Sequence, residues 1–203
     1  MKKNIKIAIQ KKGRLSEESK KFLISLGLDF PVDSKSLSLS CSNNTVNIIQ
    51  VRDDDIPKYV ENSSVDFGIV GLDVLRESGA KARIIKKLDF CRCKLVIAAP
   101  RNSNIRSLKD LTNKKIATSY PNILKNYLKN IKVEAEIVHV MGSVEVAPYL
   151  EAADAVCDIT ETGRTLKEFS LAPIKTILKS QAVLISSPAK KSAKIEFLAR
   201  LKI

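Results

Sequence analysis

The segment 154–165 combines residue types that suit a phosphorylated sugar. Asp154 and Asp158 lie four residues apart on an expected strand, and a Thr-Gly-x-Thr loop follows that strand. In the loop, Gly163 lets the main chain approach a phosphate closely, the threonine hydroxyls donate hydrogen bonds and Arg164 supplies charge. An acidic residue ahead of such a loop suits the two hydroxyl donors of a ribose ring. The pattern indicates a ribose 5-phosphate site about as strongly as it indicates a capped helix beside a solvated aspartate.

A second anion site is expected in the first half of the chain. Lys11, Lys12, Gly13 and Arg14 directly follow the first expected strand, and Arg52 ends another. Arginine guanidinium groups at such positions can hold a triphosphate through forked hydrogen bonds. The two lysines are equally consistent with surface charges, so the arginines next to strand ends are the stronger candidates.

The sequence contains only weak candidates for a metal site formed by protein side chains. The carboxylates of residues 53–55 could bind Mg²⁺, but adjacent side chains at a helix start point in different directions, so capping is an equally good interpretation. Cys91-Arg92-Cys93 lacks the two-residue spacing of zinc motifs, and His139, the one histidine, is expected to be structural. Glu145, beside a Gly-Ser turn, could meet a substrate or lie on a helix surface. No protein-held metal is predicted.

These residues need elements that bring them together, and the chain alternates short apolar runs with amphipathic segments. This alternation is typical of an α/β protein with a largely parallel sheet. Strands are expected at 5–9, 37–41, 46–51, 65–71, 94–99, 115–118, 133–140 and 155–159. Three of the later strands lead through Ser, Thr or Gly turns into helices, at 118–119, 142–143 and 162–165. In a parallel sheet such turns lie side by side at the carboxyl edge, where ligands bind and helix N–H groups are free.

A late strand at 177–178 and 182–185 has no partner unless the chain returns to its first half. We therefore expect two lobes joined by two crossovers, near residues 93–100 and 174–180. The first lobe would consist of residues 1–95 plus 178–203, and the second of residues 96–177.

Composition narrows the class of protein. The 203 residues carry a formal net charge of +13, which requires an anionic partner or serves solubility. Aromatic residues make up only 5% and no nucleic-acid-binding motif is visible, so a cleft for phosphorylated small molecules is favoured over nucleic acid. The first apolar run is broken at Lys6 and Gln10, and nothing is long enough to cross a bilayer. A cytoplasmic protein with no membrane partner is expected.

Six blocks resemble the ATP phosphoribosyltransferase family, in the family's order and over most of the chain. They are IAIQKKGRL at 7–15, VRDDDIP at 51–57, DFGIVG at 66–71, IATSYP at 116–121, GSVEVAP at 142–148 and ADAVCDI at 153–159. The resemblance implies an α/β fold of two lobes like the type II periplasmic binding proteins, with the active site in the cleft between them. It also implies attack of N1 of ATP on the anomeric carbon of phosphoribosyl pyrophosphate, which expels pyrophosphate.

The resemblance carries roles to particular residues. It implies that Asp154, Asp158 and Glu145 serve the reaction. The phosphoribosyl pyrophosphate loop would comprise Glu161, Thr162, Gly163, Arg164 and Thr165. Residues expected on the ATP side, which the first lobe would largely form, are Lys11, Gly13, Arg14, Arg52, Gly71, Ser119 and Tyr120. Magnesium would come mainly bound to the phosphates of the substrates.

The chain departs from the family pattern at two points. The family usually has Gly-Leu where this chain has Glu151-Ala152, and Asn-Gly where it has Phe169-Ser170. Losing a glycine at a helix stop costs stability or shifts the end of that helix.

The chain is expected to be the catalytic core of either a short form or a long form without its regulatory domain. The resemblance further implies a homo-oligomer, most simply a dimer, and a possible regulatory subunit like a histidyl-tRNA synthetase. A two-lobed protein that binds a phosphorylated ligand without turnover is the alternative.

Overall fold

A computed structural model describes residues 4–32, 36–42, 45–187 and 197–199 of the chain. The chain forms two compact units, residues 1–91 with 181–203 and residues 92–180. The expected lobes divided at 95/96 and 177/178, and their residues 1–3, 33–35, 43–44, 188–196 and 200–203 lie outside the described residues. Among the described helices, none has the length and apolar character that crossing a bilayer requires.

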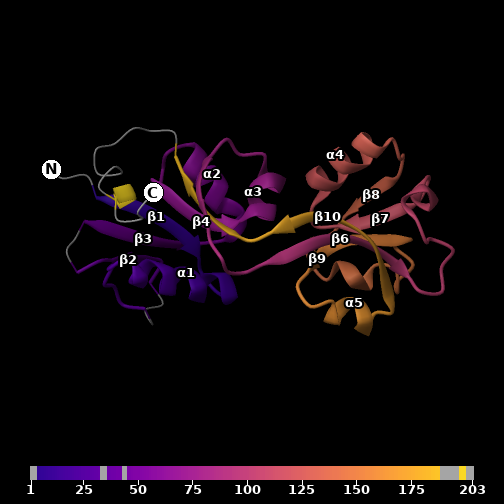
Figure 1. Ribbon diagram of the computed structural model, residues 1–203, viewed down its shortest axis with the longest axis horizontal. Coiled ribbons are helices and arrows are strands. Elements are labelled where there is room, and N and C mark those ends of the chain that lie inside the picture. The colour runs from indigo at the N-terminus through magenta and orange to yellow at the C-terminus, as the bar shows by residue number, and fades with distance from the viewer. Residues whose placement is uncertain (1–3, 33–35, 43–44, 188–196, 200–203) are drawn as a thin grey trace. The chain divides into compact units, whose positions relative to one another are not determined.

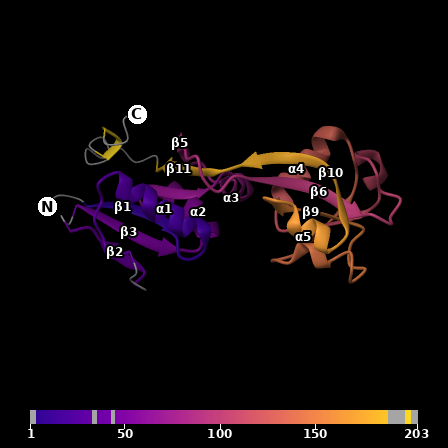
Figure 2. The ribbon, with the colours of Figure 1, turned by 60° about the horizontal axis from the view of Figure 1, so that its bottom comes forward.

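Unit 1 is built on a six-stranded sheet in the order β2-β3-β1-β4-β11-β5. β1 runs parallel to β3 and β4, whereas β11 is antiparallel to β4 and β5, and β2 to β3. Figures 1 and 2 show β1, β3 and β2 side by side. The strands are β1 (Ile5–Gln10), β2 (Ser38–Ser40), β3 (Val46–Val51), β4 (Phe67–Gly71), β5 (Arg83–Lys87) and β11 (Ala182–Ser186). The pairing of β11 with β4 confirms that the late strand returns to the first half of the chain.

Helices cover both faces of this sheet, which explains why three consecutive residues of β1, Ile7, Ala8 and Ile9, are apolar and buried. Ile7 and Ile9 belong to a core cluster with Leu23 of α1, while Ala8 belongs to a second cluster with Ile56 and other residues of α2 and α3. The helical segments are α1 (Arg14–Ser25), the 3-10 turn η1 (Asp53–Asp55), α2 (Ile56–Glu61) and α3 (Leu72–Ser78). Gly68 lets α2 pack closely, because a Cβ there would lie 2.5 Å from Ile56 Cγ2.

Unit 2 contains a five-stranded sheet in the order β10-β6-β9-β7-β8. β7 runs parallel to β8 and β9, and β6 is antiparallel to both β9 and β10. The strands are β6 (Cys93–Pro100), β7 (Lys115–Thr118), β8 (Glu136–His139), β9 (Ala155–Thr160) and β10 (Leu171–Ser180). The helical segments are η2 (Leu108–Leu111), α4 (Pro121–Ile131), η3 (Val144–Val146) and α5 (Arg164–Glu168). α4 packs into one core cluster and α5 into another, on opposite sides of the sheet in Figures 1 and 2.

Several elements differ from the sequence-based expectations, among them β8, η3 and β5. β8 begins at Glu136 rather than 133, because α4 ends in a left-handed residue, Lys132 at φ 56°, and residues 133–135 belong to no helix or strand. The expected helix after Ser143 is the single 3-10 turn η3. β5, whose side chains are mostly exposed and basic, was not predicted, since it lacks the apolar pattern that marks a strand.

Candidate active site

The carboxyl ends of β7, β8 and β9 meet at one edge of the unit 2 sheet. Thr118, the last residue of β7, is paired with His139 of β8 and with Cys157 of β9. The turn at 119–120, the turn at 142–143 and the loop 161–163 all begin at this edge. The structure therefore brings together the three turns that the strand pattern predicted to be neighbours.

The loop after β9 is held by hydrogen bonds between its own residues. The N–H of Gly163 donates to Thr160 Oγ1 at 2.9 Å, and the N–H of Arg164 donates to Thr162 Oγ1 at 3.4 Å. Gly163 has φ 78°, a left-handed conformation that favours glycine, and open space surrounds the place of a Cβ. Glu161 and Thr165 lie on either side of it and are exposed. The loop thus offers an accessible main chain to an anion.

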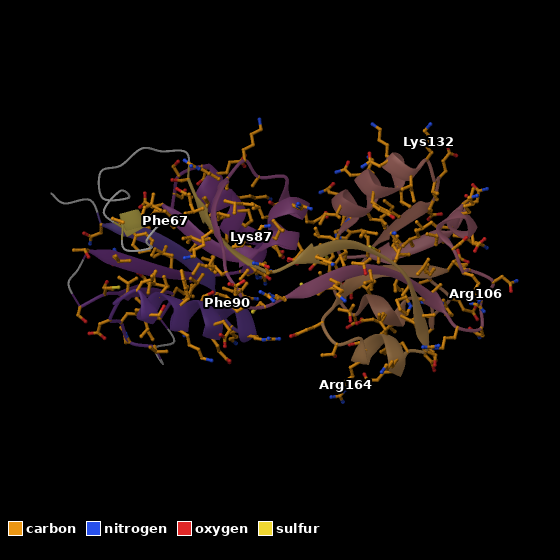
Figure 3. The ribbon with its side chains drawn as sticks, in the orientation of Figure 1. Phe67, Lys87, Phe90, Arg106, Lys132 and Arg164 are labelled. Atoms are coloured by element: carbon orange, nitrogen blue, oxygen red, sulfur yellow. The ribbon has the colours of Figure 1, made fainter. Side chains whose placement is uncertain are left out.

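Arg164, which was expected to supply charge to the loop, forms an ion pair within α5. Its Nε donates to Glu168 Oε1 at 2.9 Å, within an exposed pair four residues apart on α5. Figure 3 shows the side chain extending outward from α5. Exposed pairs of this kind contribute roughly 0–1 kcal/mol, so the guanidinium can leave Glu168 at little cost.

Asp158 and Glu145 are neighbours beside this loop. Burial raises the pKa of the Asp158 carboxyl to about 6, the N–H of Ile159 opposes that shift, and the negative charge of Glu145 adds to it. Glu145 belongs to η3, which packs against β9. A half-buried carboxyl with a raised pKa, next to an exposed loop of hydroxyls and N–H groups, is a combination that functional sites use.

Asp154 lies at the opposite edge of the same sheet. Its N–H donates to the main-chain oxygen of Lys115 at 2.9 Å, and the N–H of Lys115 donates to Asp154 Oδ2 at 2.8 Å. Lys115 begins β7, so this contact marks the amino ends of the strands. Because a strand rises about 3.3 Å per residue, four residues separate Asp154 from Asp158 by about 13 Å. The structure does not bring the two carboxylates together.

In unit 1, five residues expected to bind ATP gather at the carboxyl edge of β1, β3 and β4. The N–H of Lys11 donates to the main-chain oxygen of Val51 at 2.9 Å, so β1 and β3 end together. Gly13, at φ 87°, turns the chain into α1, which begins at Arg14. Arg52 follows β3 directly and Gly71 ends β4.

Acidic side chains share this edge. Gln10 Nε2 donates to Asp53 Oδ2 at 3.3 Å, and burial raises the pKa of Asp53, with smaller contributions from the charges of Asp54 and Asp73. The Asp73 carboxyl lies against Gly71, where a Cβ would be 2.5 Å from its Oδ1. Across the described residues, no group of three or more His, Cys, Asp or Glu side chains is arranged to hold a metal ion.

Ser119 and Tyr120, the other residues expected on the ATP side, belong to unit 2 and lie at the edge that holds the loop after β9. Ser119 Oγ donates to the main-chain oxygen of Val140 at 2.8 Å. Sequence reasoning missed two cations at this edge. Lys94 is paired with both Thr160 of β9 and Lys179 of β10, and both lysines are exposed. Their position at strand ends could have indicated these lysines as candidates, but for Lys179 that position is visible only once β10 is recognised as a strand.

Two α/β units, each with polar turns at the carboxyl edge of its parallel strands, define a class of two-lobed ligand-binding folds. The alkanesulfonate-binding protein SsuA from Xanthomonas axonopodis pv. citri has this fold, with a TM-score of 0.62, 16% identity and coverage of 98% of this chain and 70% of that one. At that identity the likeness concerns the fold alone. The fold is that of the type II periplasmic binding proteins.

Sequence comparison gives the family within that class. The family model described as HisG, ATP phosphoribosyltransferase, matches residues 52–202. The ATP phosphoribosyltransferase of Maricaulis maris is 43% identical over 191 residues, which are 91% of this chain and 65% of the relative. That of Cytophaga hutchinsonii is 38% identical over 197 residues, with 97% and 69% covered. This chain belongs to the ATP phosphoribosyltransferase family, and it spans about two thirds of the length of these relatives.

A solved structure agrees with this assignment. The ATP phosphoribosyl transferase (HisG:HisZ) complex from Thermotoga maritima contains a chain that matches with a TM-score of 0.84 and 31% identity. The match covers 98% of this chain and 96% of that one.

Proposed function

We propose that this chain transfers the phosphoribosyl group of phosphoribosyl pyrophosphate to N1 of ATP. The products are phosphoribosyl-ATP and pyrophosphate, and the reaction is the first step of histidine biosynthesis. Membership of the ATP phosphoribosyltransferase family supports the reaction. The single observation that carries it is the edge where Asp158, beside Glu145, precedes a loop of hydroxyls and N–H groups.

At that edge, phosphate and ribose have separate partners. The N–H groups and hydroxyls of residues 161–165 receive the 5-phosphate, and Arg164 swings from Glu168 to add charge. The carboxylate of Asp158 accepts hydrogen bonds from the ribose hydroxyls, and Glu145 adds a second carboxylate beside it. Asp154, at the far edge, serves the start of β7 and not the ribose, because its Oδ2 accepts from the N–H of Lys115.

The triphosphate of ATP is bound by the basic edge of unit 1. Lys11 and Arg14 lie where β1 turns into α1, and Arg52 follows the neighbouring strand, so three cations are available to the triphosphate. Gly13 keeps the main chain beside these cations accessible. We assign Gly71, Ser119 and Tyr120 to ATP as well, on the resemblance to the family. Displacement at the anomeric carbon depends mainly on orientation and on neutralising the leaving pyrophosphate.

Magnesium bound to the phosphates of the substrates would supply positive charge against the pyrophosphate, and oxygen atoms are the ligands that it prefers. The acidic edge of Asp53 and Asp73 lies beside the cations of unit 1 and favours a metal-loaded over a metal-free triphosphate.

The chain assembles into a homo-oligomer, most simply a dimer, that can bind a regulatory subunit like a histidyl-tRNA synthetase. The Thermotoga maritima relative was solved as a HisG:HisZ complex, which supports a second kind of subunit. Sedimentation of the purified chain, alone and with such a subunit, tests both statements. A monomer that ignores the subunit would contradict them.

The deciding experiment measures phosphoribosyl-ATP in the near ultraviolet, with ATP, phosphoribosyl pyrophosphate and magnesium, coupled to pyrophosphatase. Product is expected from the chain alone or with the partner subunit. If neither gives product while phosphoribosyl pyrophosphate still binds, the chain is a two-lobed binding protein without turnover.

Asp158, in β9, and Asp154, directly before β9, provide a matched pair of variants. Asp158→Asn removes the acceptor for the ribose hydroxyls and is expected to lower kcat/KM for phosphoribosyl pyrophosphate by roughly 10²-fold or more, as lost charge-assisted hydrogen bonds do. Asp154→Asn is expected to change kcat/KM less than about threefold, since its contacts lie at the other edge. Equal effects of the two substitutions would contradict the assigned ribose site.

A further inference from the structure

The end of β7 carries two hydroxyl side chains that reach opposite ways across the parallel strands of unit 2. Thr118 Oγ1 donates to the main-chain oxygen of Cys157 in β9 at 2.7 Å. Ser119 Oγ donates to the main-chain oxygen of Val140, just after β8, at 2.8 Å. Two consecutive residues therefore tie the carboxyl ends of three strands together at the edge that holds the candidate site.

Thr118 is the inner member of this pair and is fully buried, with 0% of its surface exposed. Besides donating to Cys157, its Oγ1 accepts the N–H of Tyr120 at 2.9 Å. The hydroxyl is used both as donor and as acceptor inside the protein, so it does not contact a substrate. Any influence on the reaction must act through the groups that it holds.

One of those groups is the turn that starts α4. Tyr120 is the N-cap residue of α4, at φ −123° and ψ 58°, and its side chain makes no capping hydrogen bond. The Thr118 oxygen receives the N–H of Tyr120 where the main chain leaves the strand, which fixes the direction of the turn. This turn contains the two unit 2 residues that the proposed function assigns to ATP.

The other group is the peptide that precedes Asp158. The oxygen of Cys157 belongs to the planar Cys157–Asp158 peptide, and Thr118 and Cys157 form the last pair of the β7–β9 ladder. On its other side this part of β9 is paired with β6, through Ile97 and Val96. The hydroxyl of Thr118 therefore holds the peptide from the β7 side and helps to set the direction in which the Asp158 side chain leaves the strand.

We propose that Thr118 is a positioning residue for phosphoribosyl transfer, because its one hydroxyl holds both the Ser119–Tyr120 turn and the Cys157–Asp158 peptide. The inference rests on the proposed function. When two bound substrates react, orientation dominates the rate, and an error of about 1 Å can cost roughly 10²-fold. Removing the hydroxyl takes one hydrogen bond from each group at once and leaves the Cys157–Asp158 peptide held from the β6 side alone.

The test compares three variants in the coupled assay. Thr118→Val keeps the branched shape and removes the hydroxyl, whereas Thr118→Ser keeps the hydroxyl and removes the methyl group. Leu124→Val, at a fully buried position of α4, is a control that lowers stability without touching these hydrogen bonds. Thr118→Val is expected to lower kcat by roughly 10- to 100-fold, with both KM values changed less than about threefold. Thr118→Ser is expected within about threefold of wild type, and Leu124→Val within about twofold.

A second readout does not depend on turnover. The amide hydrogen of Tyr120 is expected to exchange faster in Thr118→Val and to stay protected in Thr118→Ser. If Thr118→Val matches wild type in kcat, or if Leu124→Val loses as much, the positioning role is wrong while the proposed function stands. If wild type itself makes no product with or without its partner subunit, the proposed function is wrong, whatever the exchange experiment gives.

Discussion

Asp158 lies where stability and ligand binding make opposite demands on one carboxyl group. Burial and the charge of Glu145 disfavour its ionised form in the folded protein, and its pKa rises to about 6 from the ordinary value of 3.8. In the proposed site, the ribose hydroxyls need that ionised form as an acceptor. Folding therefore favours the protonated carboxyl, and the proposed binding favours the ionised one.

This conflict predicts the pH dependence of stability. Below about pH 4 the carboxyl is protonated in both states and costs nothing. Between pH 4 and 6 the unfolded chain loses the proton first, so folding is increasingly penalised, and above pH 6 the cost levels at about 3 kcal/mol. Asp158→Asn should match wild type at pH 4 and exceed its free energy of unfolding by up to about 3 kcal/mol at pH 8, measured by urea denaturation.

Asp110 provides a control, because its pKa is shifted in the opposite direction to that of Asp158. Hydrogen bonds from the N–H groups of Arg106 and Ser107 lower the pKa of this exposed carboxyl. Asp110→Asn should therefore lose stability relative to wild type as pH rises above the folded pKa of Asp110. If Asp158→Asn showed the same trend as Asp110→Asn, the carboxyl of Asp158 would not be strained by burial.

At the scale of elements, the two departures from the family pattern meet a conformational constraint. Glu151 has φ 56° and Ser170 has φ 52°, which is the left-handed region that favours glycine. Both residues are exposed and follow helical turns, and the family usually has glycine at both positions. A side chain in this conformation costs roughly 1–2 kcal/mol, so the turns are kept at the expense of stability.

Glu151→Gly and Ser170→Gly are each expected to stabilise unit 2 by about 0.5–1 kcal/mol. The relief of strain exceeds the greater freedom that glycine gives the unfolded chain. Thermal and urea unfolding measure the gain. Ala152→Gly is the matched control, because this neighbouring exposed residue does not have a positive φ, and it should lose about 0.5–1 kcal/mol. A loss in all three variants would show that these turns relax without strain.

Local patterns predict elements well where apolar runs meet turn residues, as in β1, β4 and β9. They fail where tertiary pairing decides, as in the exposed β5 and in β10, which is ten residues long and was recognised only in part. The same limit applies to the site. The loop 161–165 was predictable from its hydroxyls and glycine, whereas the separation of Asp154 from Asp158 follows from strand rise and from the exact start of β9. The role of Thr118 needed the β7–β9 register, which no sequence pattern carries.

At the scale of the whole molecule, the net charge of +13 creates a field that attracts polyanions. Aromatic residues and groove-reading motifs are scarce, so nucleic acid is a poor match for this charge. Both proposed substrates are small and highly phosphorylated. The net charge is therefore better explained by attraction of these substrates to two basic sheet edges, that of Lys11, Arg14 and Arg52 in unit 1 and that of Lys94 and Lys179 in unit 2.

This explanation predicts that the KM for phosphoribosyl pyrophosphate depends on salt, and that particular lysines cause this dependence. Raising KCl from 50 to 300 mM shortens the screening length and should raise the KM for phosphoribosyl pyrophosphate several-fold. Lys94→Gln, beside the carboxyl end of β9, should raise that KM at low salt and flatten its salt dependence. Lys129→Gln, in the last turn of α4, removes the same charge from another element and should leave the salt dependence as steep as in wild type. Equal flattening by both would mean that the overall charge, and not the edge of β9, attracts the substrate.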